Sequence, residues 1–256
     1  MAGTNISRAN GSGSATTKFT LSMWIKRGST DTGRMFSATG GSGDVYFRFN
    51  AGGVIEWSGH GSNASSAGYF LTNRLFRDFS SWYHFVFVWE KSASKIKYYV
   101  NGQLSEEITG SNFGDNNSWM NGYKSRIGCR NNAWASGTPN VEFFKGYMAD
   151  IYFVDGQALL PTDFGYYDTG TKQWKPKAYA GTYGANGFYL PMRVGQYTQD
   201  ETAKQLTFAG NSMASGFKPQ TNMEFGSFKF DGSGDTIYTA NNYDDVNLIK
   251  LPTSGN

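Results

Sequence analysis

SSWYHFVFVWEKSASKIKYYVN, residues 80–101, is the stretch of sequence that decides the fold. It holds two runs of aromatic and β-branched side chains, which fit a pleated, half-buried sheet, separated by the polar residues 91–94. Asn101 and Gly102 form a dipeptide suited to a tight hairpin turn, and residues 104–109 are predicted to be the returning strand. The middle of the chain is therefore predicted to be a long antiparallel meander.

The same alternation extends away from this meander. Residues 18–26 place apolar side chains on one side and mainly polar ones on the other, which predicts a strand with one apolar face. Shorter strands are predicted at residues 45–49, 53–57 and 124–130, separated by Gly- and Asn-rich breaks. The residues expected in the core are Phe19, Leu21, Ile25, Phe85, Phe87, Tyr98, Val100, Ile127, Ile151 and Phe153.

The composition favours an all-β chain. Its 256 residues suit one large β-sandwich, and 17% aromatic residues with 33 glycines suit many short strands joined by tight turns. A net charge of +3 is too small and too scattered to indicate a nucleic-acid partner. The N-terminus lacks the apolar segment of a signal peptide and no run is long enough to insert in a membrane, so we expect assembly in a cytoplasm.

Cysteine and histidine give no sign of a reactive thiol. Cys129 is the single cysteine, which excludes an intrachain disulfide, and its strand-like setting predicts a small buried residue. Neither His60 nor His84 has a spacing that indicates pairing with it.

Several segments carry a resemblance to a known superfold. Residues 82–103 are similar to the central hairpin of laminin-G-like and pentraxin-like domains, which are members of the concanavalin A-like lectin/glucanase superfold. Residues 19–27, 125–128 and 144–165 match further pieces, and the resemblance covers roughly residues 6–190. It implies a two-sheet antiparallel β-sandwich, a concanavalin A-like jelly roll.

The matched length suggests a division of the chain. We predict the sandwich over residues 1–193 and a small C-terminal β extension over residues 194–256, which either completes the sandwich or mediates oligomer contacts. The superfold hosts lectins, hydrolases and scaffolds, so it does not settle function.

Residues 173–190, QWKPKAYAGTYGANGFYL, resemble the continuation of this domain in virion proteins of tailed bacteriophages. The resemblance implies a non-enzymatic virion surface protein, a head-decoration or fibre-type subunit assembled in the host cytoplasm. Closed symmetry is the rule for such assemblies, so we expect a homo-oligomer in contact with capsid or tail proteins. The expected oligomer is a trimer. The alternatives are a tail-fibre adhesin module that binds host-surface glycans and, third, a glycan-cleaving enzyme.

The carboxylates do not favour an enzyme. Glucanases of the superfold carry a Glu-x-Asp-x-x-Glu strand that places acid and nucleophile on one face, and this chain has no such motif. Glu106 and Glu107 are adjacent and would face opposite sides of a strand. Asp150 and Asp155 have an odd spacing that also splits faces in a regular strand.

Two loops hold the candidate binding residues. Asp115, Asn116 and Asn117 could supply oxygens to calcium, although the same residue types are common in ordinary turns. Zinc is not indicated. The aromatic and amide residues of the two loops suit a sugar site, a protein interface or plain core packing. These residues are Trp119, Tyr123, Asn131, Asn132 and Trp134.

The C-terminal segment contains a strand-like match to the start of the resembled domains, FKFDGSGDTIY at residues 228–238. A sandwich without its first strand would leave an unpaired sheet edge, and residues 223–239 could fill it. They could do so in their own subunit or in a neighbouring one, or they could form a separate hairpin.

Overall fold

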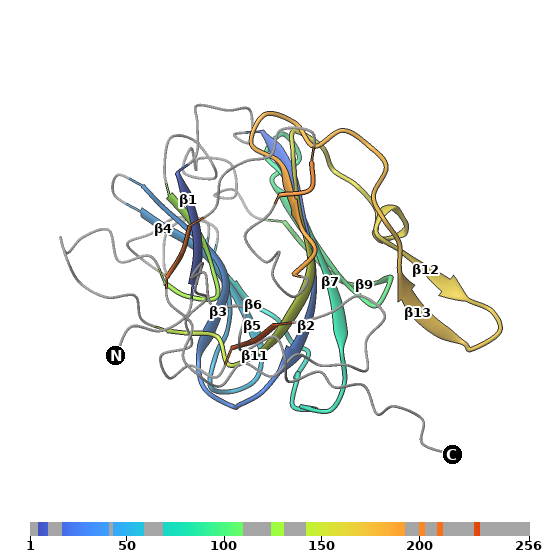
Figure 1. Ribbon diagram of the computed structural model, residues 1–256, viewed down its shortest axis with the longest axis horizontal. Helices are drawn as coiled ribbons and strands as arrows, with labels where there is room; N and C mark the ends of the chain where they lie inside the picture. The colour runs from blue at the N-terminus through green and yellow to red at the C-terminus, as the bar shows by residue number, and fades with distance from the viewer. Residues whose placement is uncertain are drawn as a thin grey trace, which may run out of the picture.

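Two antiparallel sheets face one another across a common core, as the edge-on view of Figure 1 shows. The computed structural model describes residues 5–9, 17–40, 43–58, 69–109, 124–130, 142–192, 200–202, 209–211 and 228–230. The predicted all-β antiparallel sandwich is confirmed.

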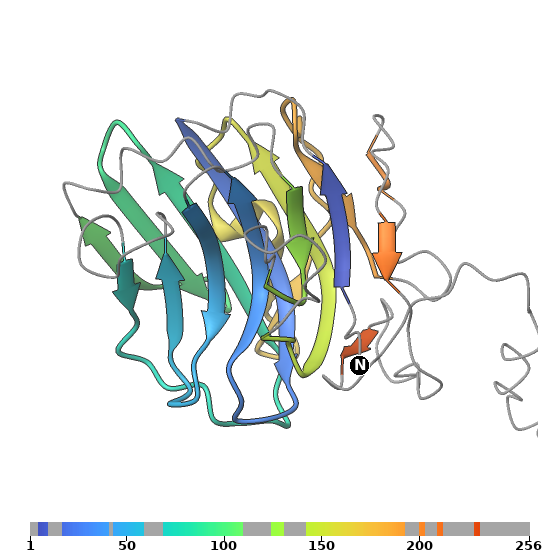
Figure 2. The ribbon, with the colours of Figure 1, turned by 90° about the vertical axis from the view of Figure 1, so that its left-hand side faces the viewer.

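The first sheet has the strand order β15-β1-β10-β3-β4-β5-β6. Its strands are β15 (Ala209–Asn211), β1 (Asn5–Ala9), β10 (Lys124–Ile127), β3 (Gly33–Gly40), β4 (Gly43–Phe49), β5 (Ile55–Ser58) and β6 (Tyr69–Leu71). Figure 2 shows strands of this sheet turned towards the viewer. β1 enters the sheet beside β10, and its residue Ile6 is buried in the core.

The second sheet has the order β14-β11-β2-β7-β8-β9. Its strands are β14 (Phe188–Leu190), β11 (Gly146–Asp155), β2 (Lys18–Arg27), β7 (Tyr83–Glu90), β8 (Lys95–Val100) and β9 (Gln103–Thr109). β7, β8 and β9 are the predicted meander, and Asn101 and Gly102 between β8 and β9 have φ values of 50° and 81°. This left-handed pair is what a tight hairpin turn requires.

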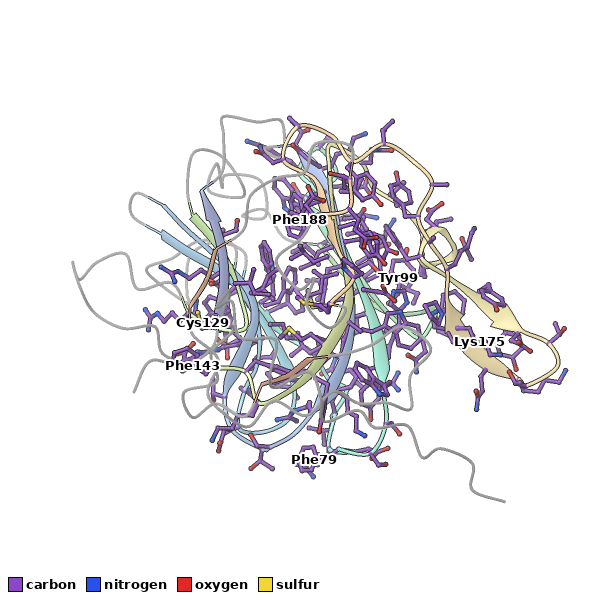
Figure 3. All side chains as sticks on the ribbon, in the orientation of Figure 1. Phe79, Tyr99, Cys129, Phe143, Lys175 and Phe188 are labelled. Carbon is purple, nitrogen blue, oxygen red and sulfur yellow. The ribbon has the colours of Figure 1, made fainter. Side chains whose placement is uncertain are left out.

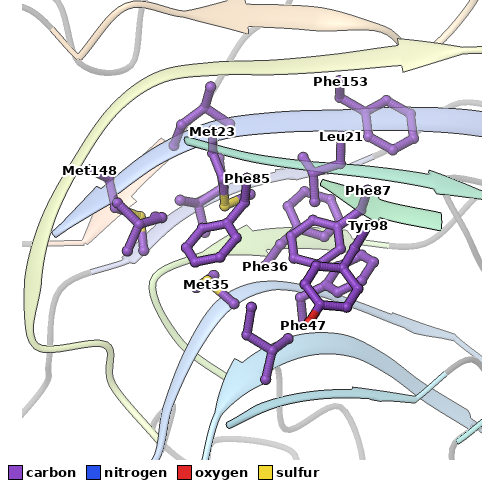
Figure 4. Packing of buried hydrophobic residues seen from close by; sticks show 14 of the residues in the cluster. Leu21, Met23, Met35, Phe36, Phe47, Phe85, Phe87, Tyr98, Met148 and Phe153 are labelled. Atoms are coloured by element: carbon purple, nitrogen blue, oxygen red, sulfur yellow. The ribbon is translucent and has the colours of Figure 1, made fainter. Parts of the chain in front are cut away.

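The core between the sheets is dominated by aromatic rings, as the close view of Figure 4 shows. The rings of Phe47 and Phe87, from opposite sheets, stack with their centroids 4.0 Å apart. All ten residues expected in the core are buried, each with at most 2% of its surface exposed.

The second sheet is buried on its outer face as well. The chain after β11 folds back over it through the 3₁₀ turn η1 (Pro161–Asp163) and the strands β12 (Gly165–Asp168) and β13 (Gln173–Pro176). Val86 and Val88 of β7 therefore pack in a second apolar cluster with Phe164, while Phe85 and Phe87 face the main core. In Figure 1 the β12–β13 hairpin projects from the sandwich.

A strand from the C-terminal region pairs within the same chain. β16 (Phe228–Phe230) runs antiparallel to Gly146–Met148 of β11, beside the place where β14 pairs with residues 151–153. Of residues 223–239 the structure describes only β16, and the choice between pairing in the same subunit and pairing in a neighbour stays a prediction. The domain boundary at residue 193 stays a prediction.

Replacing Phe87 by Ala should lower the free energy of unfolding by about 3–5 kcal/mol, because the ring leaves a cavity between the sheets. Urea unfolding measures the loss. Leu104→Ala is the control, since Leu104 is an exposed residue of β9 and should change stability by less than about 0.5 kcal/mol. Equal losses for the two variants would contradict the assigned core.

Deleting residues 223–256 should give an aggregating or unfolded protein, because removal of β16 exposes the backbone of β11 at Gly146–Met148. Light scattering and circular dichroism report the outcome. Deleting only residues 232–256 retains β16 and is the matched control. A 223–256 deletion that stays soluble and as heat-stable as the control would show that β16 is dispensable.

Candidate functional site

A depression lies between the projecting hairpin and the second sheet. We call it the hairpin groove; its volume is about 840 Å³. Its lining comes from segments far apart in the sequence: Trp24, Ser81, Trp82, residues 101–103, Ala149, Asp150, Tyr166, Tyr167 and residues 172–176. Figure 3 places Lys175 on the hairpin, well away from the interior of the sandwich.

Trp174 of β13 attaches the hairpin to the sheet. Its indole ring lies so close to Gly102 and Gly165 that a Cβ atom at either glycine would come within 2.5–2.6 Å of the ring. Glycine at these two positions therefore leaves the space that the indole ring occupies. The indole Nε1–H donates a hydrogen bond of 2.9 Å to Nδ1 of His84 in β7.

His84 continues this bond into the sheet. Its Nε2 lies 2.8 Å from Oγ of Ser22, and its ring stacks on Trp24 with centroids 4.9 Å apart. An indole N–H can only donate, so Nδ1 of His84 is the acceptor and the neutral ring carries its proton on Nε2. Burial lowers the pKa of His84 to about 3, so the ring stays neutral at physiological pH.

The same tautomer decides what the Ser22–His84 pair can do. A serine nucleophile needs an imidazole nitrogen that accepts its proton, with a carboxylate on the other nitrogen. Here Nε2–H donates to Ser22 Oγ, and the other nitrogen receives an N–H from Trp174. Ser22 is also fully buried. The pair is therefore a structural bond and not a nucleophile with its base.

Aromatic side chains form much of the groove wall. Trp24 of β2, Trp82 just before β7, and Tyr166 and Tyr167 of the hairpin all line it. The two tyrosines are exposed, Tyr167 by 56% of its surface. Flat rings presented to solvent offer apolar faces on which a ligand ring can stack.

Polar groups stand between these rings. Asn101 is oriented by the neighbouring strand β7, because its Oδ1 accepts a 2.8 Å hydrogen bond from the backbone N–H of His84. Gln103 and Gln173 add amide groups that can donate and accept. The indole Nε1–H of Trp24 is buried and has no acceptor among the residues described.

Asp150 gives the groove a buried carboxylate. It lies in a β-bulge of β11, where the register with β2 shifts between Ala149 and Tyr152, and its φ is 45°. One of its oxygens accepts a 2.7 Å hydrogen bond from the hydroxyl of Tyr189. Burial, and after it the charge of Asp150, raise the pKa of Tyr189, so this hydroxyl remains a donor. A left-handed non-glycine residue at a bulge is a conformation often found at functional sites.

The other carboxylates considered in the sequence have separate partners. Glu106 accepts from the Tyr98 hydroxyl and the Asn73 backbone, while Glu107 pairs with Lys95 on the other face of β9. Asp155 accepts from the backbone N–H of Asn186, and its strand is not regular because the bulge separates it from Asp150. Cys129 is buried as predicted, and burial raises the pKa of its thiol to about 12.

A charged network on the outer face of the first sheet was not foreseen. Arg34, which is 2% exposed, pairs with Glu142 at 2.5 Å, and Arg48 bridges Glu142 at 2.9 Å and Glu56 at 2.6 Å. The Tyr46 hydroxyl donates to Glu56, and burial raises its pKa. The network links β3, β4 and β5, and its mutual pairing indicates a structural role.

The sequence-predicted binding residues lie outside the part of the chain that the structure describes. This holds for Asp115, Asn116 and Asn117, proposed for calcium, and for the residues proposed for a glycan: Trp119, Tyr123, Asn131, Asn132 and Trp134. Their roles stay predictions. Among the described residues, no group of three or more His, Cys, Asp or Glu side chains could hold a metal ion.

The hairpin groove was not predicted from the sequence. Residues 173–190 were singled out only as a resemblance, although they include Trp174, on which the groove depends. The signal that could have indicated it is Tyr166-Tyr167 followed by Trp174 in a segment rich in turn residues. That pattern shows exposed aromatics but not the strand against which they lie.

Comparison with known proteins identifies the family. The profile of the concanavalin A-like lectin/glucanases superfamily matches residues 2–163, more than half of the chain, so the chain belongs to this superfamily. A search of curated proteins returned no match.

Two solved structures are similar to this chain. A putative carbohydrate binding protein from Bacteroides ovatus is similar with 15% identity and a TM-score of 0.55, covering 93% of this chain and 62% of its own. The heptameric SAP-like pentraxin from Limulus polyphemus is similar with 19% identity and a TM-score of 0.46, covering 62% of this chain and 72% of its own. At 15% identity the likeness to the Bacteroides ovatus protein concerns the fold alone.

No helix among the described residues is long and apolar enough to cross a membrane.

The buried His84 predicts a pH dependence of stability. Its pKa is about 3 in the folded protein and about 6.5 when unfolded, so the unfolded chain binds a proton first as the pH falls. The free energy of unfolding should drop between pH 6.5 and pH 3, by up to about 1.4 kcal/mol per pH unit from this group. Urea unfolding across this range measures it. His84→Gln lacks the titrating ring and should show a shallower fall; an equal slope in both proteins would contradict the assignment.

Proposed function

We propose that this chain is a non-catalytic, glycan-binding subunit on the surface of a tailed-bacteriophage virion. The observation that carries the proposal is the hairpin groove, where aromatic rings, amides and a buried carboxylate line one depression beside a projecting hairpin. The superfamily to which the chain belongs includes lectins, which is compatible with this use of the fold.

Sugar chemistry fits such a lining. A pyranose presents an apolar C–H face, which stacks on a flat aromatic ring, and a rim of hydroxyls, which donate to and accept from amides and carboxylates. Trp82 and Tyr167 offer such rings, and Asn101, Gln103 and Asp150 offer hydrogen-bonding groups beside them. The groove thus brings both kinds of contact within one depression.

The virion assignment rests on the segment that builds the groove. Residues 173–190 resemble virion proteins of tailed phages, and Trp174 within them attaches the hairpin to the sheet. We propose that the protein is assembled in the host cytoplasm as a homo-oligomer, namely a trimer, that contacts capsid or tail proteins. A tail-fibre adhesin would use the same groove from another position on the particle.

The absence of catalysis is supported by the arrangement of the described carboxylates and of His84. Ser22 and His84 have the wrong proton arrangement for a nucleophile and base, and Asp150 and Asp155 have separate hydrogen-bond partners. Glycan cleavage is therefore less well supported than glycan binding as the function of this groove.

Purified virions should contain the protein in many copies by mass spectrometry, and the purified protein should bind glycans on an array without releasing reducing ends. The array is run with and without calcium, which also tests the prediction for Asp115, Asn116 and Asn117. Electron microscopy of the virion then places it on the head or the tail. Detection only in infected lysate would remove the virion role, and no glycan bound under either condition would remove the binding role.

A further inference from the structure

We propose that the glycan bound in the hairpin groove is acidic, and that Lys26, next to the rings of Trp82 and Tyr147, pairs with its anionic group. The inference rests on the proposed glycan-binding function and concerns the class of glycan. It is drawn from the register of neighbouring strands, from two ring contacts and from the charges of the described residues.

Lys26 and Tyr147 stand on the outer face of the second sheet. Ile25 of β2 and Met148 of β11 belong to the main core, and Figure 4 shows Met148 there. Because side chains alternate along a strand, the residues next to these two face away from the core. Lys26 and Tyr147 are directly paired across β2 and β11. Their side chains therefore emerge side by side on the outer face.

This pair continues the lining of the hairpin groove. Trp24 of β2 and Ala149 of β11 both line the groove and pair with each other. Lys26 and Tyr147 are the next pair on the same face, about 7 Å further along the two strands. A ligand that extends out of the groove along β2 and β11 in this direction therefore meets Lys26.

Two aromatic rings accompany Lys26. Trp82, which also lines the groove, has its ring centroid 6.2 Å from that of Tyr147. The Nζ atom of Lys26 lies 5.7 Å from the centre of the Tyr147 ring, a distance at which a cation is attracted to the ring face. All three side chains are partly exposed. A sugar ring that stacks on one of the two rings can thus bring an acidic substituent to the ammonium.

The accessible charges beside the groove are positive. Among the residues that the structure describes, neither Lys26 nor the groove residue Lys172 takes part in a salt bridge. Lys175 is paired with Asp168 at 2.8 Å, and Asp150 is only 5% exposed. Accessible charges of one sign favour a ligand of the opposite sign. A carboxylate on the glycan would give Lys26 the anionic partner that these residues do not supply.

The experiment uses the full chain in native gels cast with soluble polysaccharides, where binding retards migration. The acidic probes are alginate, hyaluronate and polygalacturonate. The neutral probes are mannan, dextran and methyl-esterified polygalacturonate, which keeps the backbone of the acidic polymer and removes its charge. Lys26→Gln removes the cation, and Lys26→Arg retains it. Lys18→Gln is the matched control, because Lys18 is an exposed lysine at the other end of the same strand.

We expect at least one acidic polysaccharide to retard the protein, and the retardation to weaken as the salt concentration rises. Lys26→Gln should weaken this binding about tenfold, as expected for the loss of a hydrogen bond to a charged group. Lys26→Arg and Lys18→Gln should bind like the parent. Equal melting temperatures of the four proteins exclude a folding effect. Where polygalacturonate binds, its methyl ester should not.

Three outcomes overturn the inference in different ways. Retardation by neutral probes alone would refute the acidic ligand and leave the glycan-binding function standing. Binding of an acidic probe that Lys26→Gln and Lys18→Gln change equally, or not at all, would refute the role of Lys26. If no polymer retards the protein, the acidic or neutral character of the glycans that it binds on the array decides instead. A protein that binds nothing in either assay would refute the proposed function itself.

Discussion

The hydrogen-bonded chain from Trp174 through His84 to Ser22 is the contact on which the outer layer of this protein depends. It joins the projecting hairpin to two adjacent strands of the second sheet, β7 and β2, through a ring that is fully buried and neutral. A buried imidazole without these partners would cost free energy, whereas here both nitrogens are satisfied. The two glycines that flank the indole leave this geometry little freedom. The hairpin groove exists because this contact holds the hairpin beside the sheet.

This layer also explains the composition of the second sheet. Sandwich strands usually alternate between an apolar inner face and a polar outer face. In β7 every second residue, Phe85 and Phe87, enters the main core, while Val86 and Val88 lie beneath the covering segment with Tyr152 and Phe164. A strand covered on both sides becomes nearly continuous in apolar residues, which is why residues 85–89 show no polar position.

The sequence predicted the sandwich well because its signals are local. Alternation along residues 18–26 and 81–101 identifies strands and their inner faces, and the Asn101-Gly102 pair identifies a turn. The groove could not be predicted in this way, because its lining joins segments separated by more than 100 residues in the chain. The bulge at Asp150 inserts one residue without a composition signal, so alternation gave no indication that this side chain reaches the groove.

Asp150 is costly to the fold in two respects. A left-handed backbone suits glycine or asparagine better than aspartate, and burial disfavours the charged carboxylate. Tyr189 offsets part of the second cost by donating a hydrogen bond. The bulge thus keeps a buried carboxylate at the edge of the hairpin groove, where it lies among the lining residues and is oriented by Tyr189. An ionised carboxylate accepts stronger hydrogen bonds than a neutral amide does, which repays part of the cost of burying it.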